Sequence, residues 1–207
     1  MVKINYKNLT CLILLINIIL VSFGGCENTT AQLNNYIDAK NLTQEQKQVV
    51  ELISTDKFQI IMFDFTTEEI YKTRDFWIET YKRGELIDSR AAGITTMNDN
   101  GEALSGEIAV TINQTPEYQW TFIYTEKNGT KASNISEFNS NYVSGVNAYY
   151  IINHPIEIED GEEIVLYASL FNKDGKIHDI DNLQNLVDKN YLEEYEYAHI
   201  IKCRFLK

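Results

Sequence analysis

The sequence predicts a mainly β domain, an antiparallel β-sandwich of immunoglobulin-like architecture with one accessory helix near each end of the domain. Short segments rich in β-branched and aromatic residues recur along most of the chain, and turn signals such as Asn128-Gly129 separate them. Apolar residues at helical spacing occur over residues 43–54 and 182–194. Because helices do not alternate with the strands, a doubly wound parallel sheet is disfavoured. The Cys–Trp–Cys pattern of antibody domains is absent, so the prediction concerns architecture alone.

The first predicted helix covers residues 43–54. Thr43 and Gln46 have the spacing of a capping box, in which two unpaired amides at a helix start are satisfied reciprocally. An apolar face follows at helical spacing, made of Val49, Val50, Leu52 and Ile53.

Predicted strands begin at residue 57. Alternation is clearest after Arg74, where Phe76 and Ile78 point one way and Trp77 and Glu79 point the other. The predicted strands are 57–65, 74–82, 85–88, 107–113, 118–126, 131–138, 146–153, 162–171 and 197–207.

A second helix is predicted over residues 182–194, with Asp181 as its cap. Its apolar residues recur at helical spacing: Leu183, Leu186, Val187, Leu192 and Tyr195. In the last strand, His199, Cys203 and their alternate neighbours share one face. Cys203 should therefore be a buried, inert thiol on the inner face of the sandwich.

The first 26 residues indicate export. Lys3 and Lys7 precede an apolar run over residues 9–23, which is shorter than the roughly 20 residues that a spanning helix needs. A basic start, a short apolar centre and small residues at the end are typical of a secretory signal peptide.

The end of this segment, Phe23-Gly24-Gly25-Cys26, resembles a bacterial lipobox, with Phe23 in place of the usual leucine. The resemblance implies cleavage before Cys26 and acylation of the Cys26 thiol by diacylglycerol, with fatty acids such as palmitate. Two acyl chains would anchor the protein stably to a membrane. The predicted organisation is a signal peptide over 1–25, a flexible tether over 26–42 and one sandwich domain over 43–207.

Composition agrees with an exported, acidic protein. The chain has a net charge of −12, and the two lysines of the leader leave −14 on the remainder. Such a surface repels nucleic acid, so no nucleic-acid partner is predicted. Cys203 would be the one cysteine left after cleavage and acylation, so no internal disulfide is predicted. Abundant Asn, Ile, Lys and Tyr with only two prolines suggest a low-GC Gram-positive host.

Two segments resemble catalytic or metal-binding motifs but lack essential residues of those motifs. Ser54-Thr55-Asp56-Lys57 matches S-x-x-K, but the companion elements of penicillin-recognising enzymes are missing. Residues 96–107 approach a calcium loop, but Thr96 replaces the first aspartate. We therefore predict no catalytic residue, no cofactor and no metal ligand.

Three other groups of residues are candidates for binding. The acidic run 157–163 should be a solvated strand edge, although it could attract a cation. His154, His178 and His199 lie far apart and are expected to be structural or at the surface, although His178 has Asp179 and Asp181 beside it. A third group is aromatic and fills either the core or a binding surface: Trp77, Trp120, Tyr149 and Tyr150.

The favoured function is a binding or interaction module of the cell envelope, anchored by lipid outside the cytoplasm. Its partner could be an envelope protein, a wall polymer or a cationic peptide. One alternative is an envelope hydrolase whose site is assembled from separated residues. Another is an immunity-type lipoprotein that captures a cationic toxin or peptide through acidic residues such as Glu157, Glu159 and Glu162. No motif places the domain in a named family, and it is similar in general character to Gram-positive lipoproteins of unknown function.

Overall fold

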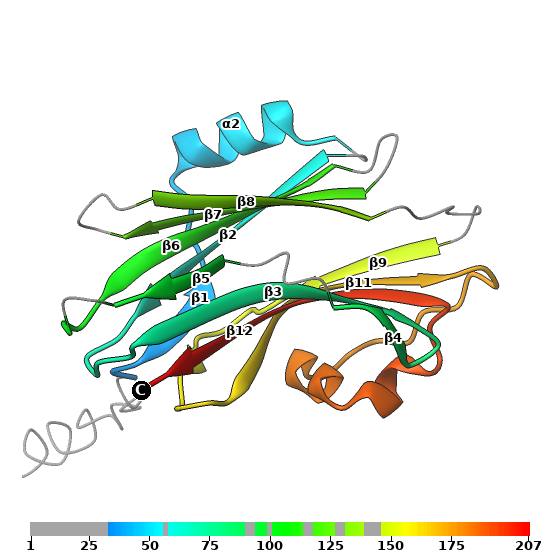
Figure 1. Ribbon diagram of the computed structural model, residues 1–207. Coiled ribbons are helices and arrows are strands. Elements are labelled where there is room, and N and C mark those ends of the chain that lie inside the picture. Colours follow the sequence, from blue (N-terminus) through cyan, green and yellow to red (C-terminus); the bar gives the residue numbers. More distant parts are fainter. Residues whose placement is uncertain are drawn as a thin grey trace, which may run out of the picture. The chain divides into compact units, whose positions relative to one another are not determined.

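Two antiparallel sheets, each of six strands, pack face to face in the computed structural model, so the predicted β-sandwich is confirmed (Figure 1). The structure describes residues 33–55, 58–89, 94–98, 101–113, 118–126, 131–138 and 146–207, and for 118 and 131–138 it describes the backbone alone. The predicted signal peptide and Cys26 lie outside these residues. Leu33–Lys207 form one compact unit.

Sheet A has the strand order β10-β1-β2-β6-β7-β8. Its strands are β10 (Ile156–Glu157), β1 (Tyr36–Ala39), β2 (Phe58–Thr66), β6 (Ser105–Asn113), β7 (Tyr118–Glu126) and β8 (Lys131–Phe138). Residues 36–39 fall in the segment expected to be a tether. They instead form β1, because Ile37 is fully buried and the strand pairs with both β2 and β10.

Sheet B has the order β4-β3-β12-β11-β9, and β5 also pairs with β3. Its strands are β3 (Thr73–Lys82), β4 (Glu85–Asp88), β5 (Ile94–Met97), β9 (Val146–Ile151), β11 (Glu163–Asn172) and β12 (Tyr197–Leu206). The immunoglobulin-like prediction holds at the level of two packed antiparallel sheets. Six strands in each sheet exceed the four and three of an immunoglobulin constant domain.

Aromatic rings join the two sheets. Phe65 of sheet A stacks on Tyr124 with centroids 5.9 Å apart, and it lies 5.6 Å from the ring of Phe205 in sheet B. Gly106 makes this packing possible, because a Cβ atom there would stand 2.7 Å from the Phe65 ring. Ring contacts of this kind contribute beyond their area of burial.

The inner face of β12 is as predicted. Cys203 is fully buried, and burial raises the pKa of its thiol well above the usual range. His199 is also buried, its Nδ1 lies 2.9 Å from the Thr80 hydroxyl, and burial lowers its pKa to about 3. The histidine is therefore neutral in the folded protein at ordinary pH.

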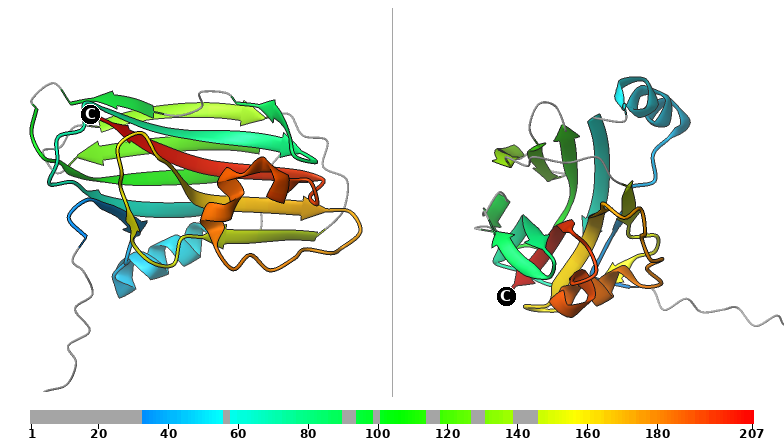
Figure 2. Two further views of the ribbon diagram at one scale, coloured as in Figure 1. Left: turned by 90° about the horizontal axis from the view of Figure 1, so that it is seen from below. Right: turned by 90° about the vertical axis from the view of Figure 1, so that its right-hand side faces the viewer.

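The outer face of sheet B is covered by two 3₁₀ helices, η1 (Leu183–Val187) and η2 (Lys189–Leu192) (Figure 2). The predicted α-helix over 182–194 is therefore wrong. The side chains of Asn182 and Asp188 each accept the amide two residues further on, and each starts a short new turn. Leu186, Leu192 and Tyr195 pack against β11 and β12, as the apolar pattern predicts, whereas Val187 is 42% exposed.

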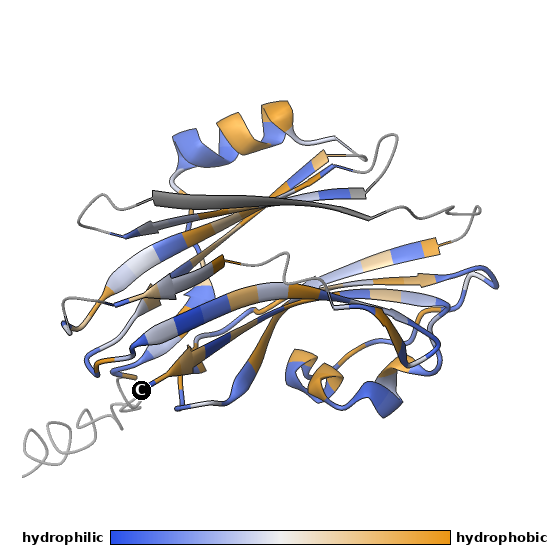
Figure 3. Ribbon diagram, in the orientation of Figure 1, coloured by the Kyte–Doolittle hydropathy of each residue, from blue (hydrophilic) through white to orange (hydrophobic). Residues whose placement is uncertain are grey.

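The helix α2 (Gln44–Ile53) confirms the first helical prediction, including the capping box. Thr43 N donates to Gln46 Oε1 at 2.9 Å, and Gln46 N donates to Thr43 Oγ1 at 3.3 Å. The helix nevertheless projects beyond the sheets and has no buried residue, and 83% of Leu52 is exposed. In Figure 3 this helix has several orange, apolar segments, and the side chains of Val49, Leu52 and Ile53 are exposed.

Candidate functional site

A hollow of about 390 Å³ lies on the outer face of sheet B, between the loop that leaves β11 and the 3₁₀ helices. We call it the acidic pocket. It is lined by His178, Asp179, Ile180, Asp181, Asn185, Leu186, Asn190, Tyr191, Glu194 and Tyr195.

One buried side chain fixes the loop to the end of the 3₁₀ segment. The Nδ2 group of Asn172 donates to the carbonyls of Lys176 at 2.7 Å and Glu194 at 3.1 Å, and its Oδ1 accepts the amide of Glu196 at 2.8 Å. Asn172 stands at the end of β11 and is itself buried. Because three backbone groups depend on one amide, the two walls of the pocket are held at a set separation.

The tip of the same loop is a tight turn. Asp174 Oδ1 accepts the amide of Lys176 at 3.1 Å, and Gly175 has a φ of 76°, a conformation that glycine adopts without strain. Lys173 on this turn forms an ion pair with Glu196. These contacts fix the conformation of the turn that precedes His178.

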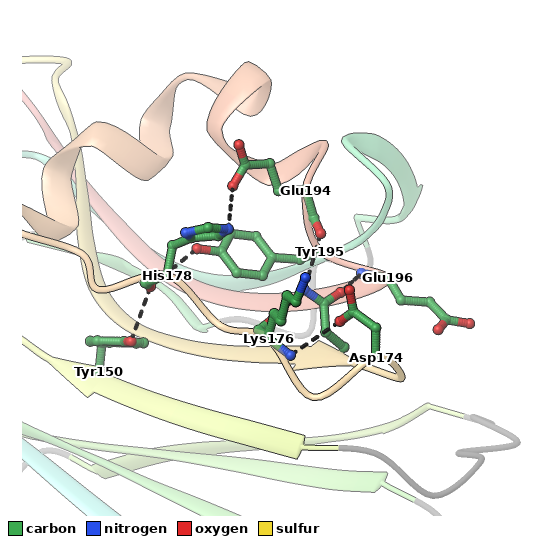
Figure 4. A network of polar contacts seen from close by, with 8 residues as sticks. Tyr150, Asp174, Lys176, His178, Glu194, Tyr195 and Glu196 are labelled. Atoms are coloured by element: carbon green, nitrogen blue, oxygen red, sulfur yellow. Dashed lines mark hydrogen bonds and ion pairs between the residues drawn. The ribbon is translucent and has the colours of Figure 1, made fainter.

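His178 stands on the rim and is held from two sides (Figure 4). Its backbone carbonyl accepts the hydroxyls of Tyr150 at 3.4 Å and Tyr195 at 3.5 Å, and its Nε2 lies 3.5 Å from Glu194 Oε2. Burial raises the pKa of both tyrosines, and Asp179 adds to the effect at Tyr150. Both phenols therefore keep their protons and act as donors to the loop.

The floor of the pocket is apolar, and η1 is hydrogen-bonded to sheet B beside it. Leu186 and Tyr195 are buried against the outer face of β11 and β12. Gln184 fixes η1 to β11, because its Oε1 accepts the amide of Val165 at 2.9 Å and its Nε2 donates to the carbonyl of Val165 at 2.8 Å. This contact falls at the bulge between Val165 and Tyr167, where the strand register shifts.

Charge on the rim is mostly negative. Asp179, Asp181 and Glu194 supply three carboxylates, and the lining contains no lysine or arginine. Tyr191 adds an exposed aromatic ring. Carboxylates beside an aromatic face attract ammonium and guanidinium groups. The acidic pocket therefore offers several hydrogen-bond acceptors to a cationic group.

A second hollow, of about 410 Å³, lies beside Trp77 on the same face of sheet B. Its charges are already paired within the chain. Lys202 Nζ lies 2.7 Å from Glu79 Oε2 and 3.0 Å from Glu163 Oε2, and Arg204 pairs with Asp75 at 3.3 Å. We name Lys202, Glu79 and Glu163 the Lys202 cluster and interpret it as structural.

The predicted binding features separate in space. His178, Asp179 and Asp181 come together with Glu194, which sequence alone did not associate with them. His154 is exposed on a loop and His199 is in the core, so the three histidines lie apart as predicted. No group of three or more ligating side chains suited to a metal ion occurs in the described part of the chain.

The acidic run forms a strand edge, as expected. Glu157 lies on β10, the terminal strand of sheet A, and Glu157 and Glu159 are exposed on either side of the buried Ile158. Glu163 forms an ion pair with Lys202. None of these carboxylates lines the acidic pocket.

The aromatic candidates also divide. Trp120 is in the core, 5.6 Å from the His199 ring, whereas Trp77 is half-buried and donates to Glu79 at 3.0 Å. Tyr150 supports the rim of the acidic pocket, and Tyr149 is partly exposed on β9. Sequence reasoning missed Tyr191, because its position in a supposed helix gave no sign of a pocket wall.

The rejected motifs stay without support. Ser54 is the C-terminal cap of α2, and Lys57 lies outside the described residues. Thr96 belongs to β5, where it pairs with Arg74, and Asn100 also lies outside the described residues.

The fold and the pocket define a β-sandwich domain with a preformed acidic surface site. The particular family is the YgaN domain, whose family model matches residues 36–205, and the chain belongs to it. This assignment supplies the named family that the motifs did not reveal. Comparisons with curated proteins and with solved structures returned no match. In the described ranges, no helix combines the length and the apolar character required to cross a membrane.

Proposed function

We propose that this protein is a lipid-anchored binding module of the cell envelope whose acidic pocket holds a cationic group of a peptide partner. The observation that carries the proposal is the pocket itself. Three carboxylates and an exposed tyrosine surround a hollow with a fixed floor, and no cationic side chain of the lining other than His178 competes for them.

The anchoring part of the proposal rests on Phe23-Gly24-Gly25-Cys26. The compact unit begins at Leu33, seven residues after Cys26. At about 3.5 Å per residue, an acylated Cys26 would hold the domain within about 25 Å of the outer leaflet. A module kept this close to the membrane would meet cationic peptides where they accumulate on anionic lipid.

Anchoring is tested on protein purified from its own host. Mass spectrometry of the N-terminus should show a chain that begins at Cys26 and carries fatty acid. A chain that retains Met1, or a Cys26 without acyl groups, would remove the anchor. A pull-down from the native envelope with the lipidated protein then identifies the partner.

Pocket binding is tested by calorimetry with acetyl-tetralysine amide in low salt. Asp179→Asn with Asp181→Asn should weaken binding at least tenfold, because two of three rim charges are lost. Glu157→Gln with Glu159→Gln is the matched control, since it removes the same net charge from exposed positions outside the pocket. Equal losses in both variants would show that net charge, and not the pocket, attracts the peptide.

Salt gives an independent check on the same complex. Binding to the intact protein should weaken steeply as sodium chloride rises, because rim carboxylates exposed to solvent are screened over about 10 Å at 0.1 M. Affinity that does not change with salt would contradict recognition of a cationic group.

A further inference from the structure

Strand β9 stands at one end of the strand order of sheet B, and its sequence differs from that of most other terminal strands. Val146–Ile151 contains no charged residue and no proline. Three other terminal strands carry charges: Glu157 in β10, Glu85 and Asp88 in β4, and Lys131 and Glu137 in β8. Strand β5, which among the described strands pairs only with β3, has no charge either, but it is only four residues long. Proteins commonly place charges on edge strands to prevent pairing with other chains, and β9 lacks this protection.

Most side chains of β9 are apolar, and three of the large ones are exposed. Val146, Tyr149 and Ile151 are each exposed by at least 40%. By register, Tyr149 and Ile151 face the same side as Ser169 and Tyr167, which is the inner side of sheet B. Among the strands that the structure describes, β11 alone pairs with β9.

The acidic pocket adjoins this edge. Tyr150 is the outward-facing neighbour of Tyr149, and its hydroxyl donates to the backbone carbonyl of His178 on the pocket rim. Figure 4 shows Tyr150 on β9 directed at the loop that carries His178. Asp179 is near enough to raise the pKa of Tyr150.

From this placement we propose that β9 pairs with an extended peptide, which becomes an added strand of sheet B and inserts cationic side chains toward the acidic pocket. An added strand lies about 4.8 Å from β9, and its side chains alternate between the two faces. Side chains on the outer face would meet the loop of Asp179, and those on the inner face would meet Tyr149 and Ile151. The partner is therefore an extended peptide in which cationic and apolar residues alternate.

This inference rests on the proposed function, since the acidic pocket supplies the attraction for the cationic residues. The probe is an acetylated and amidated octapeptide of alternating lysine and valine, titrated into the full chain by calorimetry. A block peptide of four lysines followed by four valines has the same charge and composition. Strand addition predicts that the alternating peptide binds at least tenfold more tightly than the block peptide.

Backbone pairing is tested with two further peptides, one N-methylated at every lysine and the other at every valine. In an added strand, alternate amides face β9 and the rest face solvent. One methylated peptide should therefore lose at least tenfold in affinity, and the other should bind nearly as well as its parent.

A protein variant gives the reciprocal test. Ile151→Lys places a charge beside the edge and should weaken the alternating peptide at least fivefold. Ile123→Lys is the matched control, because Ile123 is exposed by 37% against 43% for Ile151 but lies on β7, inside sheet A between β6 and β8. Thermal unfolding of both variants verifies that each is folded.

The outcomes separate the two proposals. If the alternating, block and methylated peptides all bind equally, strand addition is overturned. The proposal that the acidic pocket binds a cationic group is then retained. If none of the peptides binds, the proposed function fails and this inference fails with it. Equal weakening by Ile151→Lys and Ile123→Lys would also overturn the role of the edge.

Discussion

Replacing Lys202 by methionine tests how a buried cation stabilises sheet B. Lys202 lies on β12 with 3% of its side chain exposed, and both of its partners come from other strands, Glu79 from β3 and Glu163 from β11. Methionine keeps the length and the apolar stem but removes the charge. Glu79, with 13% of its side chain exposed, would then be a largely buried carboxylate without a cation.

The expected loss is about 3 kcal/mol in the free energy of unfolding at pH 7, because removal of one partner leaves the other charge buried and uncompensated. The matched control is Lys40→Met. Lys40 pairs with Asp64 and Glu107, whose side chains are 45% and 47% exposed, so water can take over their solvation. That variant should lose about 1 kcal/mol or less.

Urea unfolding at a series of pH values measures both variants. Burial alone would raise the pKa of Glu79, but hydrogen bonds from Lys202, Tyr81 and Trp77 outweigh it and hold the pKa below its usual value. A depressed pKa contributes stability above the unfolded-state pKa, and this contribution is lost as pH falls through the folded-state pKa. Lys202→Met weakens that contribution, so the gap between variant and wild type should narrow from pH 7 to pH 4. A gap below 1 kcal/mol at pH 7, or one that does not depend on pH, would refute the reasoning.

Three further outcomes are expected. Gly106→Ala should lower the free energy of unfolding, measured in urea, by about 2 kcal/mol, because the new methyl group would overlap the Phe65 ring. An unchanged urea midpoint would contradict this close packing. The buried His199 has a folded-state pKa of about 3 against 6.5 for an ordinary histidine, so the unfolded chain binds the extra proton first as the solution is acidified. The contribution of His199 to stability should fall by up to about 1.4 kcal/mol per pH unit from pH 6 down to its folded-state pKa of about 3, and His199→Gln should remove this part of the pH dependence. Iodoacetamide at pH 8 should alkylate Cys203 only after denaturation, which peptide mass spectrometry can measure; labelling of the native protein would contradict its burial.

Much of the sandwich follows from local sequence, because alternation of side chains is a property of neighbouring residues. Strand β3 was predicted for this reason, and the capping box of α2 was predicted from the spacing of Thr43 and Gln46, which is also local. The run of apolar residues in β11 predicted a strand, but not that η1 covers its outer face, because the cover comes from a later segment. The residues around β1 are mostly polar, so the sequence did not predict this strand. Its Ile37 is buried only because β1 pairs with β2 and β10.

Only one wall of the acidic pocket could be anticipated from the sequence. His178, Asp179 and Asp181 are neighbours in the chain and could be noticed together. Glu194 joins them through Asn172, whose three hydrogen bonds tie distant backbone groups. The Lys202 cluster was hidden for the same reason, since Lys202 and Glu79 are 123 positions apart.

Strand β12 occupies the middle of sheet B, between β3 and β11, although it follows all the other described strands in the chain. A nascent polypeptide that stops short of Leu206 therefore cannot unite β3 with β11. Sheet B can therefore close only after β12 has been synthesised, so its folding depends on contacts between segments far apart in the chain.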